Sequence, residues 1–238
     1  MTSLRVRSGS CGLALSLLAL TVGMSGTAHS QAPAASSAPG AAGEHGPQRP
    51  PLFFREEWKQ GPKGGENPVS ATSLSDPDLE LTVIAPGGQI ELTGNAGDEN
   101  NPTHVWGGLC TTPCGVALRS KQHLADLTGL ARIRWNTKMS GFHQVRPIVK
   151  LADGTWLAAD RAEGSTRDWL VSELSFADLH WLKLDITRGV TTGVILEHVD
   201  LSKVDQIGFI DLMPGSGHGP GGWSDVAQLE VYAKSVPR

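Results

Sequence analysis

Apolar and polar residues alternate one by one along much of this chain, and this alternation restricts what it can fold into. The clearest case is 131–138, where one set (Ala131, Ile133, Trp135 and Thr137) alternates with another (Arg132, Arg134, Asn136 and Lys138). A period of two places the two sets on opposite faces of a β-strand. Since no segment longer than a turn or two follows the 3.6-residue period of a helix, we predict an all-β protein.

The alternation recurs in short segments that are separated by turn residues. A strand is predicted over 142–151 after a turn at Ser140-Gly141, and Asp153-Gly154 is the expected hairpin turn before a strand over 155–160. Further strands are expected at 79–84, 89–93, 116–120, 169–174, 179–186, 205–212 and 226–233. Single helical turns are expected at 124–127 and 201–204. Short strands at this spacing predict an antiparallel β-sandwich.

Two N-terminal segments are predicted to precede a single sandwich domain over 52–238. Residues 1–30 have the pattern of a signal peptide, with Arg5 and Arg7 before an apolar stretch and a small-residue cleavage site at its end. A buried helix or a retained anchor is the alternative, although the apolar stretch is short for a membrane span. Residues 31–51 are rich in Ala, Pro, Gly and Ser, which predicts a flexible tether. The protein is therefore expected to be secreted or periplasmic.

Export also changes the interpretation of the cysteines. Cys110 and Cys114 stand in a C-T-T-P-C segment and are the pair that remains once the signal peptide is removed. In an oxidising compartment such a pair predicts a disulfide. Zinc binding is the alternative, but it would need further ligands, and the sequence has neither a second cysteine pair nor a nearby H-x-H.

Tryptophan dominates a scarce aromatic set and points to a recognition surface. The chain has 7 Trp, 5 Phe and 1 Tyr. If the apolar sets face inward, the opposite sets form one outer face that carries Trp156, Trp169 and Trp181 among polar side chains. An indole can stack on a pyranose ring while polar groups bond to its hydroxyls. The residues expected to bind a sugar are Arg134, Gln144, Arg146 and Lys150 for polar contacts, Trp156 as the stacking platform and Asp160 as a hydroxyl acceptor.

The charge of this face would suit an acidic sugar. Arg and Lys are in local excess there although the net charge of the chain is −4, and an Arg can bind a uronate carboxylate through two hydrogen bonds. A solvated or covered face is the alternative, because residues 52–103 could lie across it. Two Gly-rich loops, 104–108 and 214–223, each contain a His and a Trp and form a second candidate region. They could be binding loops or simply long connections.

The order of strands resembles that of the galactose-binding-like jelly-roll domains. The segments that carry the resemblance are DLTGLARIRWNTKMSGFHQVRPIVKLADGTW, DWLVSELSF, DLSKVDQIGFIDLMPG and VAQLEVYAK, between residues 115 and 235. The group includes carbohydrate-binding modules and the domain of the complex I intermediate-associated protein family. The resemblance implies a jelly-roll sandwich. Such folds often carry a structural calcium near the termini, for which Glu230 could serve as a ligand; no other cofactor is expected.

No catalytic motif accompanies this pattern. The sequence has no G-x-S-x-G, H-E-x-x-H or phosphate-binding loop, no Lys/Arg run suited to nucleic acid, and no internal apolar run long enough to span a membrane. We therefore expect an exported, monomeric, carbohydrate-binding protein without catalysis. A glycoside hydrolase or lyase that uses the same face is the first alternative. A cell-surface module that binds another protein is the second.

Overall fold

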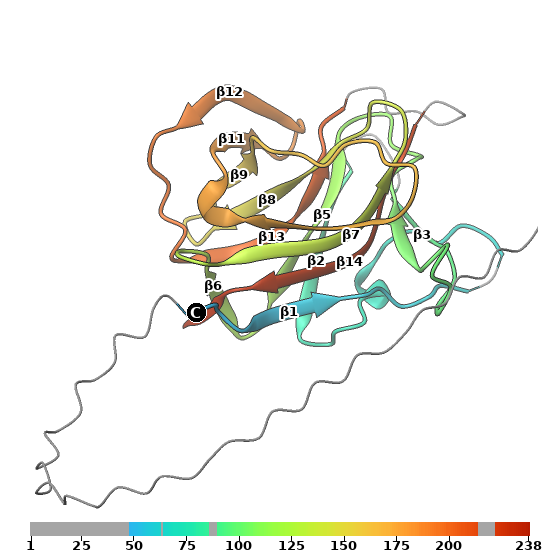
Figure 1. Cartoon of the computed structure of the whole chain (residues 1–238), viewed down its shortest axis with the longest axis horizontal. Helices are drawn as coiled ribbons and strands as arrows, with labels where there is room; N and C mark the ends of the chain where they lie inside the picture. The colour runs from blue at the N-terminus through green and yellow to red at the C-terminus, as the bar shows by residue number, and fades with distance from the viewer. Residues whose placement is uncertain (1–47, 63, 86–89, 214–221) are drawn as a thin grey trace, which may run out of the picture. The chain divides into compact units, whose positions relative to one another are not determined.

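The computed structural model describes residues 48–62, 64–85, 90–213 and 222–238. These residues form two antiparallel β-sheets (Figure 1). The main apolar core draws on both sheets, and a smaller apolar cluster lies on strands of the larger sheet. The predicted antiparallel β-sandwich is confirmed. The predicted signal peptide and most of the predicted tether lie outside the described residues. None of the helices in the described ranges is long and apolar enough to cross a membrane.

The first sheet, sheet A, is built around its longest strand, β14. Its strand order is β10 (Leu170–Ser175), β7 (Arg132–Met139), β14 (Ser224–Tyr232), β4 (His104–Trp106) and β3 (Glu91–Thr93). A sixth strand, β1 (Leu52–Glu56), pairs with the C-terminal half of β14, whereas β4 pairs with its beginning. Both short strands therefore flank β14 on the side opposite β7.

The second sheet, sheet B, has nine strands. Its main order is β12 (Val190–Leu196), β11 (Trp181–Asp185), β9 (Trp156–Ala159), β8 (Val145–Leu151), β13 (Val204–Asp211), β5 (Cys114–Ser120) and β2 (Leu79–Ile84). Off this path, β6 (His123–Asp126) pairs with β13 and with β15 (Lys234–Pro237). Two single 3-10 turns, η1 (Ala71–Ser73) and η2 (Phe176–Asp178), interrupt the connections.

The alternation in 131–138 has the predicted effect on burial. Along β7 every second residue is buried, and Ile133, Trp135 and Met139 are almost completely enclosed in the core. The indole N–H of Trp135 donates to Ser172 Oγ at 2.9 Å, which satisfies its one polar group inside the protein. The inward placement of Trp135 is confirmed.

The pairing of the strands is only partly as predicted. The Asp153-Gly154 hairpin joins β8 to β9, and Gly154 adopts a positive φ of 91° in its turn. The hairpin implied between 131–138 and 142–151 is wrong, because β7 belongs to sheet A and β8 to sheet B. Alternation indicates which side of a strand is buried. Strands in both sheets show it, so it does not reveal which strands pair.

Both predicted helical turns are wrong. The segment around 124–127 is strand β6, which pairs with β15 at the C-terminal end of the described chain. Residues 202–203 form a bend that leads directly into β13. For 124–127, a strand partner far away in the sequence decides the conformation.

The predicted disulfide is confirmed. Cys110 and Cys114 are bonded, with their Cα atoms 6.3 Å apart. The bond connects the turn after β4 to the first residue of β5, and the Gly107 N–H in the same turn donates to the Ser224 carbonyl at 2.9 Å. The segment between β4 and β5 is therefore held by a hydrogen bond at Gly107 and by the disulfide at Cys110.

Candidate functional site

The single outer face expected from strand alternation is divided between the two sheets. Arg134 lies on β7 in sheet A, whereas Arg146, Lys150 and Trp156 lie on β8 and β9 in sheet B. The outer faces of a sandwich point in opposite directions, so Arg134 cannot join the others at one ligand. The expected grouping is wrong because β7 and β8 do not pair.

Several of the expected site residues are engaged in contacts within the protein. Arg134 Nη1 donates to Glu230 Oε2 at 3.0 Å. Asp160 accepts from the backbone N–H of His180 and contacts the His180 ring, both at 2.9 Å. Gln144 is exposed in the loop before β8. Arg134 and Asp160 are therefore already paired inside the protein, and Arg134 lies in a different sheet from the expected site residues on β8 and β9.

Arg146 forms a hydrogen bond to the neighbouring strand beside Pro147. Its Nη1 donates to the Ala159 carbonyl of the neighbouring strand at 3.3 Å, where Pro147 has no N–H to offer. Arg146 is half-buried, and burial lowers the pKa of its guanidinium. This arginine therefore completes the hydrogen bonding between β8 and β9.

Lys150 and Trp156 are the two expected residues that share a cavity. The Lys150 Nζ lies 5.7 Å from the centre of the Trp156 ring. Their cavity on the outer face of sheet B, which we call the sheet-B cavity, has a volume of about 480 Å³. It is lined by Thr82, Val83, Ile84, Ala85, Lys150, Trp156, Ile186, Thr187 and Gln206.

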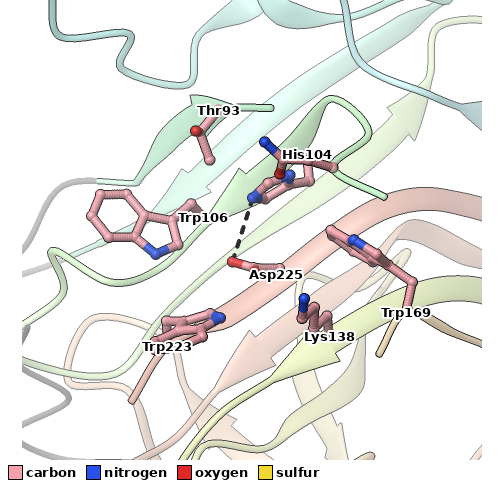
Figure 2. A pocket seen from close by; sticks show the side chains of 8 residues that line it. Thr93, His104, Trp106, Lys138, Trp169, Trp223 and Asp225 are labelled. Carbon is pink, nitrogen blue, oxygen red and sulfur yellow. Dashed lines mark ion pairs between the residues drawn. The ribbon is translucent and has the colours of Figure 1, made fainter. Parts of the chain in front are cut away.

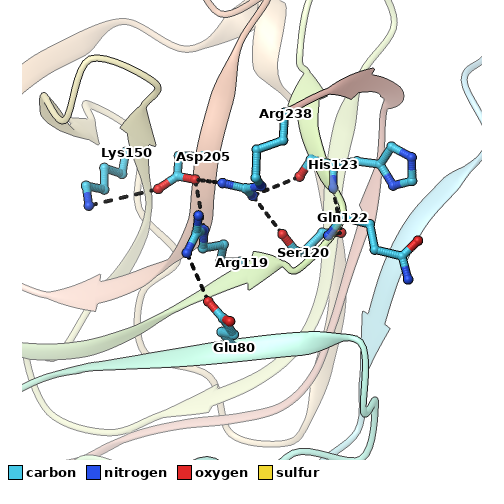
Figure 3. A network of polar contacts seen from close by, with 8 residues as sticks. All are labelled: Glu80, Arg119, Ser120, Gln122, His123, Lys150, Asp205 and Arg238. Atoms are coloured by element: carbon cyan, nitrogen blue, oxygen red, sulfur yellow. Dashed lines mark hydrogen bonds and ion pairs between the residues drawn. The ribbon is translucent and has the colours of Figure 1, made fainter.

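Lys150 also belongs to a network of charges around Asp205 (Figure 3). Its Nζ lies 3.9 Å from Asp205 Oδ2, and Arg119 Nε donates to Asp205 Oδ1 at 3.1 Å. Arg238 contacts the same carboxylate and donates to the carbonyls of Ser120 and His123 at 2.7 and 3.0 Å. The Asp205 carboxylate thus contacts three cationic side chains.

Glu230, the expected calcium ligand, does not fit a cation. Its Oε1 accepts from Arg55 at 2.7 Å and Gln228 at 3.0 Å, and its Oε2 accepts from Arg134 at 3.0 Å and Tyr232 at 2.8 Å. Two guanidinium groups beside the carboxylate would repel a metal ion. The described ranges contain no group of three or more His, Cys, Asp or Glu side chains placed to hold a metal.

The tryptophans are distributed differently from the prediction. Trp181 was expected to face outward, but it is buried and stacks against Phe176 with the ring centres 6.4 Å apart. Its register opposite Ala159 of β9, an inward residue, decides this. Trp58 is also buried, and its indole N–H donates to the Val226 carbonyl at 3.1 Å.

Three other tryptophans gather around one cavity on the outer face of sheet A. Trp106, Trp169 and Trp223 are half-buried, and their indoles surround a space of about 320 Å³ (Figure 2). We call this cavity the indole pocket. It is lined by Thr93, Asn101, His104, Trp106, Lys138, Trp169, Trp223 and Asp225.

Strand register places the polar residues of the pocket. Asp225 on β14 lies directly opposite Lys138 on β7 and opposite Trp106 on β4. Residues in register on neighbouring strands point to the same side of a sheet, so these three side chains form a row. Trp223 stands immediately before β14. One row across three strands thus supplies a cation, a carboxyl group and an indole.

Close contacts with the backbone hold two of the indoles that line the pocket. The Trp169 indole N–H donates to the Asn100 carbonyl at 3.1 Å, and its ring meets the His104 ring edge to face with the centres 5.0 Å apart. Trp106 packs against Gly108, where a Cβ atom would lie 2.3 Å from its ring atoms. Only a glycine leaves room for the Trp106 indole at that position.

Residues 94–103 frame the indole pocket. Asn101 lines it, and Pro102 and Thr103 line a neighbouring cavity that reaches Asn136 and Gln228 on the same face. Part of the segment 52–103 thus borders the outer face of sheet A, which is the segment that the alternative of a covered face invokes. The indole pocket itself stays open beside this segment.

Asp225 and His104 form a buried polar pair at the base of the pocket. Asp225 Oδ1 lies 3.6 Å from His104 Nε2, and the two side chains are 8% and 5% exposed. This separation is within ion-pairing range, but burial raises the pKa of Asp225 to about 7 and lowers the pKa of His104 to about 4. Between these values both groups are uncharged, so we treat the pair as neutral.

Each member of the pair keeps a polar atom directed at the other. His104 Nδ1 lies 2.7 Å from the Pro102 carbonyl, which fixes the proton of the neutral ring on Nδ1 and leaves Nε2 as an acceptor. Trp223 donates a hydrogen bond to the Asp225 carboxyl. Among the described residues nothing donates to Asp225 Oδ1, although this atom is buried. The pair therefore places a carboxyl group and an imidazole at the base of a cavity lined by indoles.

Sequence reasoning found only part of this pocket. The two Gly-rich loops had marked His104, Trp106 and Trp223, although residues 214–221 of the second loop lie outside the described part. Lys138 and Asp225 were missed as a pair. No local signal joins them, because their proximity depends on the register of β7 with β14.

Comparisons with known proteins match the chain to solved carbohydrate-binding modules at low sequence identity. No protein-family model matches the chain, and no curated protein sequence matches it significantly. A family 11 carbohydrate-binding module of a cellulosomal cellulase of Clostridium thermocellum is 14% identical, with 71% of this chain and 95% of that chain covered and a TM-score of 0.44. A family 30 module is 13% identical, with 76% and 100% covered and a TM-score of 0.42. A family 29 module complexed with cellulohexaose is 13% identical, with 66% and 93% covered and a TM-score of 0.36.

Proposed function

We propose that this chain is an exported carbohydrate-binding protein and that the indole pocket holds a sugar ring. The observation that carries the proposal is the convergence of Trp106, Trp169 and Trp223 on one cavity with polar groups at its base. Indoles stack on the apolar face of a pyranose, and the carboxyl and imidazole groups can bond to its hydroxyls. The Cys110–Cys114 disulfide supports export, because disulfides persist in oxidising compartments.

We further propose that binding occurs without hydrolysis. Most glycoside hydrolases use two carboxyl groups that flank the scissile bond. Among the lining residues of the indole pocket, Asp225 is the one carboxyl group. A single buried carboxyl suits recognition, since it can donate or accept a hydrogen bond without a partner for acid–base catalysis.

The sheet-B cavity is a second candidate surface for carbohydrate. Trp156 offers an indole face there, with Lys150 and Gln206 beside it as polar groups. We place it second because a single indole lines it and because Lys150 is engaged with Asp205. An acidic ligand would have to compete with that carboxylate.

Affinity electrophoresis against a panel of neutral and acidic polysaccharides tests the proposal. We expect at least one polysaccharide to retard the wild-type protein and Trp223→Ala to lose the retardation. Trp156→Ala serves as the matched control, because it removes an indole from the sheet-B cavity alone. Circular dichroism of each variant verifies the fold, and an assay for new reducing ends tests for hydrolysis. Unretarded migration of the wild-type protein in every gel would refute the proposal.

A further inference from the structure

The indole pocket contains a lysine whose charge has no close counter-ion. Lys138 is half-buried on β7, directly opposite Asp225 on β14. Among the described residues no carboxylate oxygen lies within 4.0 Å of its Nζ. By contrast, Lys150 in the sheet-B cavity lies 3.9 Å from Asp205. The charge of Lys138 is therefore available to a ligand.

The carboxyl group beside Lys138 is held in its neutral form. Asp225 is almost fully buried, and the desolvation of its charge outweighs the attraction of Lys138. The groups that face Asp225 from the neighbouring elements are Lys138 on β7, His104 on β4 and the Trp223 indole just before β14. His104 carries no charge near neutral pH, because burial lowers its pKa to about 4. The pocket then has one net positive charge.

A protonated carboxyl differs from a carboxylate in what it can bind. It has one O–H to donate, and Asp225 lines the pocket with a carboxyl whose Oδ1 has no hydrogen-bond partner among the described residues. A ligand carboxylate can accept this proton in a hydrogen bond and pair with the ammonium of Lys138 at the same time. An ionised Asp225 would instead repel it across a short distance between indole walls, where charges interact strongly.

We propose that the indole pocket binds the carboxylate of a uronic acid residue between the Lys138 ammonium and the protonated Asp225 carboxyl. This inference rests on the proposed function and names its ligand class. In this proposal Lys138, and not an arginine of the sheet faces, binds the acidic sugar, because Arg132 and Arg134 are already paired with Glu173 and Glu230. The sugar ring then lies against the indoles while its carboxylate reaches the base of the pocket.

The arrangement predicts that affinity for uronates falls as the pH rises through about 7, where Asp225 loses its proton. If only the protonated protein binds, affinity at pH 8.5 is about thirtyfold lower than at low pH. A ligand without a carboxylate gains nothing from the protonated form. Its affinity should therefore stay constant over the same range.

Isothermal titration at pH 5.5 and 8.5 with the full chain tests this. The probes are oligomers of galacturonate, of glucuronate, and of mannuronate with guluronate, each beside its carboxyl-reduced neutral counterpart. We expect at least one acidic oligomer to bind more tightly at pH 5.5 by about tenfold or more. Asp225→Asn should bind the same oligomer with no pH dependence, because an amide keeps the shape and a donor but does not titrate. Lys138→Gln should weaken acidic binding alone, and Lys234→Gln, at an exposed lysine on β15, is the matched control with unchanged binding.

The possible failures are distinguishable. Equal affinity of the acidic oligomers at both pH values, or an undiminished pH dependence in Asp225→Asn, would overturn the uronate inference. Binding of neutral glycans alone would also overturn it, but the proposed carbohydrate binding would stand. If no acidic or neutral glycan binds, the proposed function itself is wrong.

Discussion

The two cavities on opposite sheets contain similar residues in different states. Each has a lysine and at least one tryptophan, yet Lys150 belongs to a closed network around Asp205, whereas Lys138 stands beside a buried, neutral carboxyl. In the sheet-B network the carboxylates of Asp205 and Glu80 offset part of the charge of three cations, Arg119, Lys150 and Arg238 (Figure 3). Each cavity contains one buried oxygen without a hydrogen-bond partner among the described residues, Asp225 Oδ1 in the indole pocket and Gln206 Oε1 in the sheet-B cavity. The difference teaches that residue type alone does not mark a ligand site; a lysine without a close carboxylate inside a concave wall of several indoles marks it better.

The largest expected effect separates the two cavities by their indoles. Replacing Trp106 and Trp223 together by alanine should weaken glycan binding about a hundredfold, because each stacking contact is worth about 1 kcal/mol beyond the apolar area that it buries. Trp156→Ala should leave the affinity within about twofold. Titration calorimetry with the polysaccharide that retards the wild-type protein measures both. A larger loss in Trp156→Ala would reverse the assignment of the site.

A smaller effect concerns stability on the sheet-B side. Asp205→Ala leaves Arg119, Lys150 and Arg238 around a missing carboxylate, so we expect the free energy of unfolding to fall by about 1–3 kcal/mol. Glycan binding at the indole pocket should not change. Urea denaturation measures the first quantity and affinity electrophoresis the second. A stable Asp205→Ala variant that binds less glycan would show that the sheet-B network takes part in binding.

A single methyl group should sharpen the comparison further. Gly108→Ala puts a Cβ atom against the Trp106 ring and should displace the indole, with about a tenfold loss of affinity, or about 1.4 kcal/mol. Gly164→Ala is the matched control, since its Cβ atom would meet only Gln144, at 3.9 Å. Tryptophan fluorescence reports the displaced ring and calorimetry the affinity. Unchanged binding in Gly108→Ala would mean that Trp106 does not contact the sugar.

The fold was more accessible from the sequence than the site was. The alternation in 131–138 correctly predicts which side of β7 is buried, because a strand has only two faces and the apolar set must face the core. It cannot predict the partner of β7, so Arg134 and Arg146 were grouped although their strands lie in different sheets. Pairing depends on contacts between segments far apart in the chain.

The indole pocket shows the same limit at the level of register. Trp106 and Trp223 were visible in their Gly-rich loops, but Lys138 was one charged residue among three on its strand. It meets Asp225 because β14 pairs with β7 in one register, which shifts between Val226 and Gln228 at an irregularity in the ladder. Such an irregularity has no short sequence signal.

The smallest expected effect is the pH dependence of stability in the wild-type protein, because the contributions of Asp225 and His104 should nearly cancel. The raised pKa of Asp225, about 7, means that the folded state binds the extra proton, so its contribution to stability is lost as pH rises from about 4 towards 7. The lowered pKa of His104, about 4, means that the unfolded state binds the extra proton, so its contribution is lost as pH falls from 6.5 towards 4. Both states therefore carry one proton on this pair between pH 4 and 6.5. Each single variant removes one of the two opposing contributions. Relative to wild type, the free energy of unfolding of Asp225→Asn should rise with pH over this range, and that of His104→Gln should fall. Each slope is at most about 1.4 kcal/mol per pH unit. Urea unfolding of the three proteins at half-unit pH steps measures these slopes, and variants whose curves run parallel to that of the wild type would show that the pair does not titrate as a buried unit.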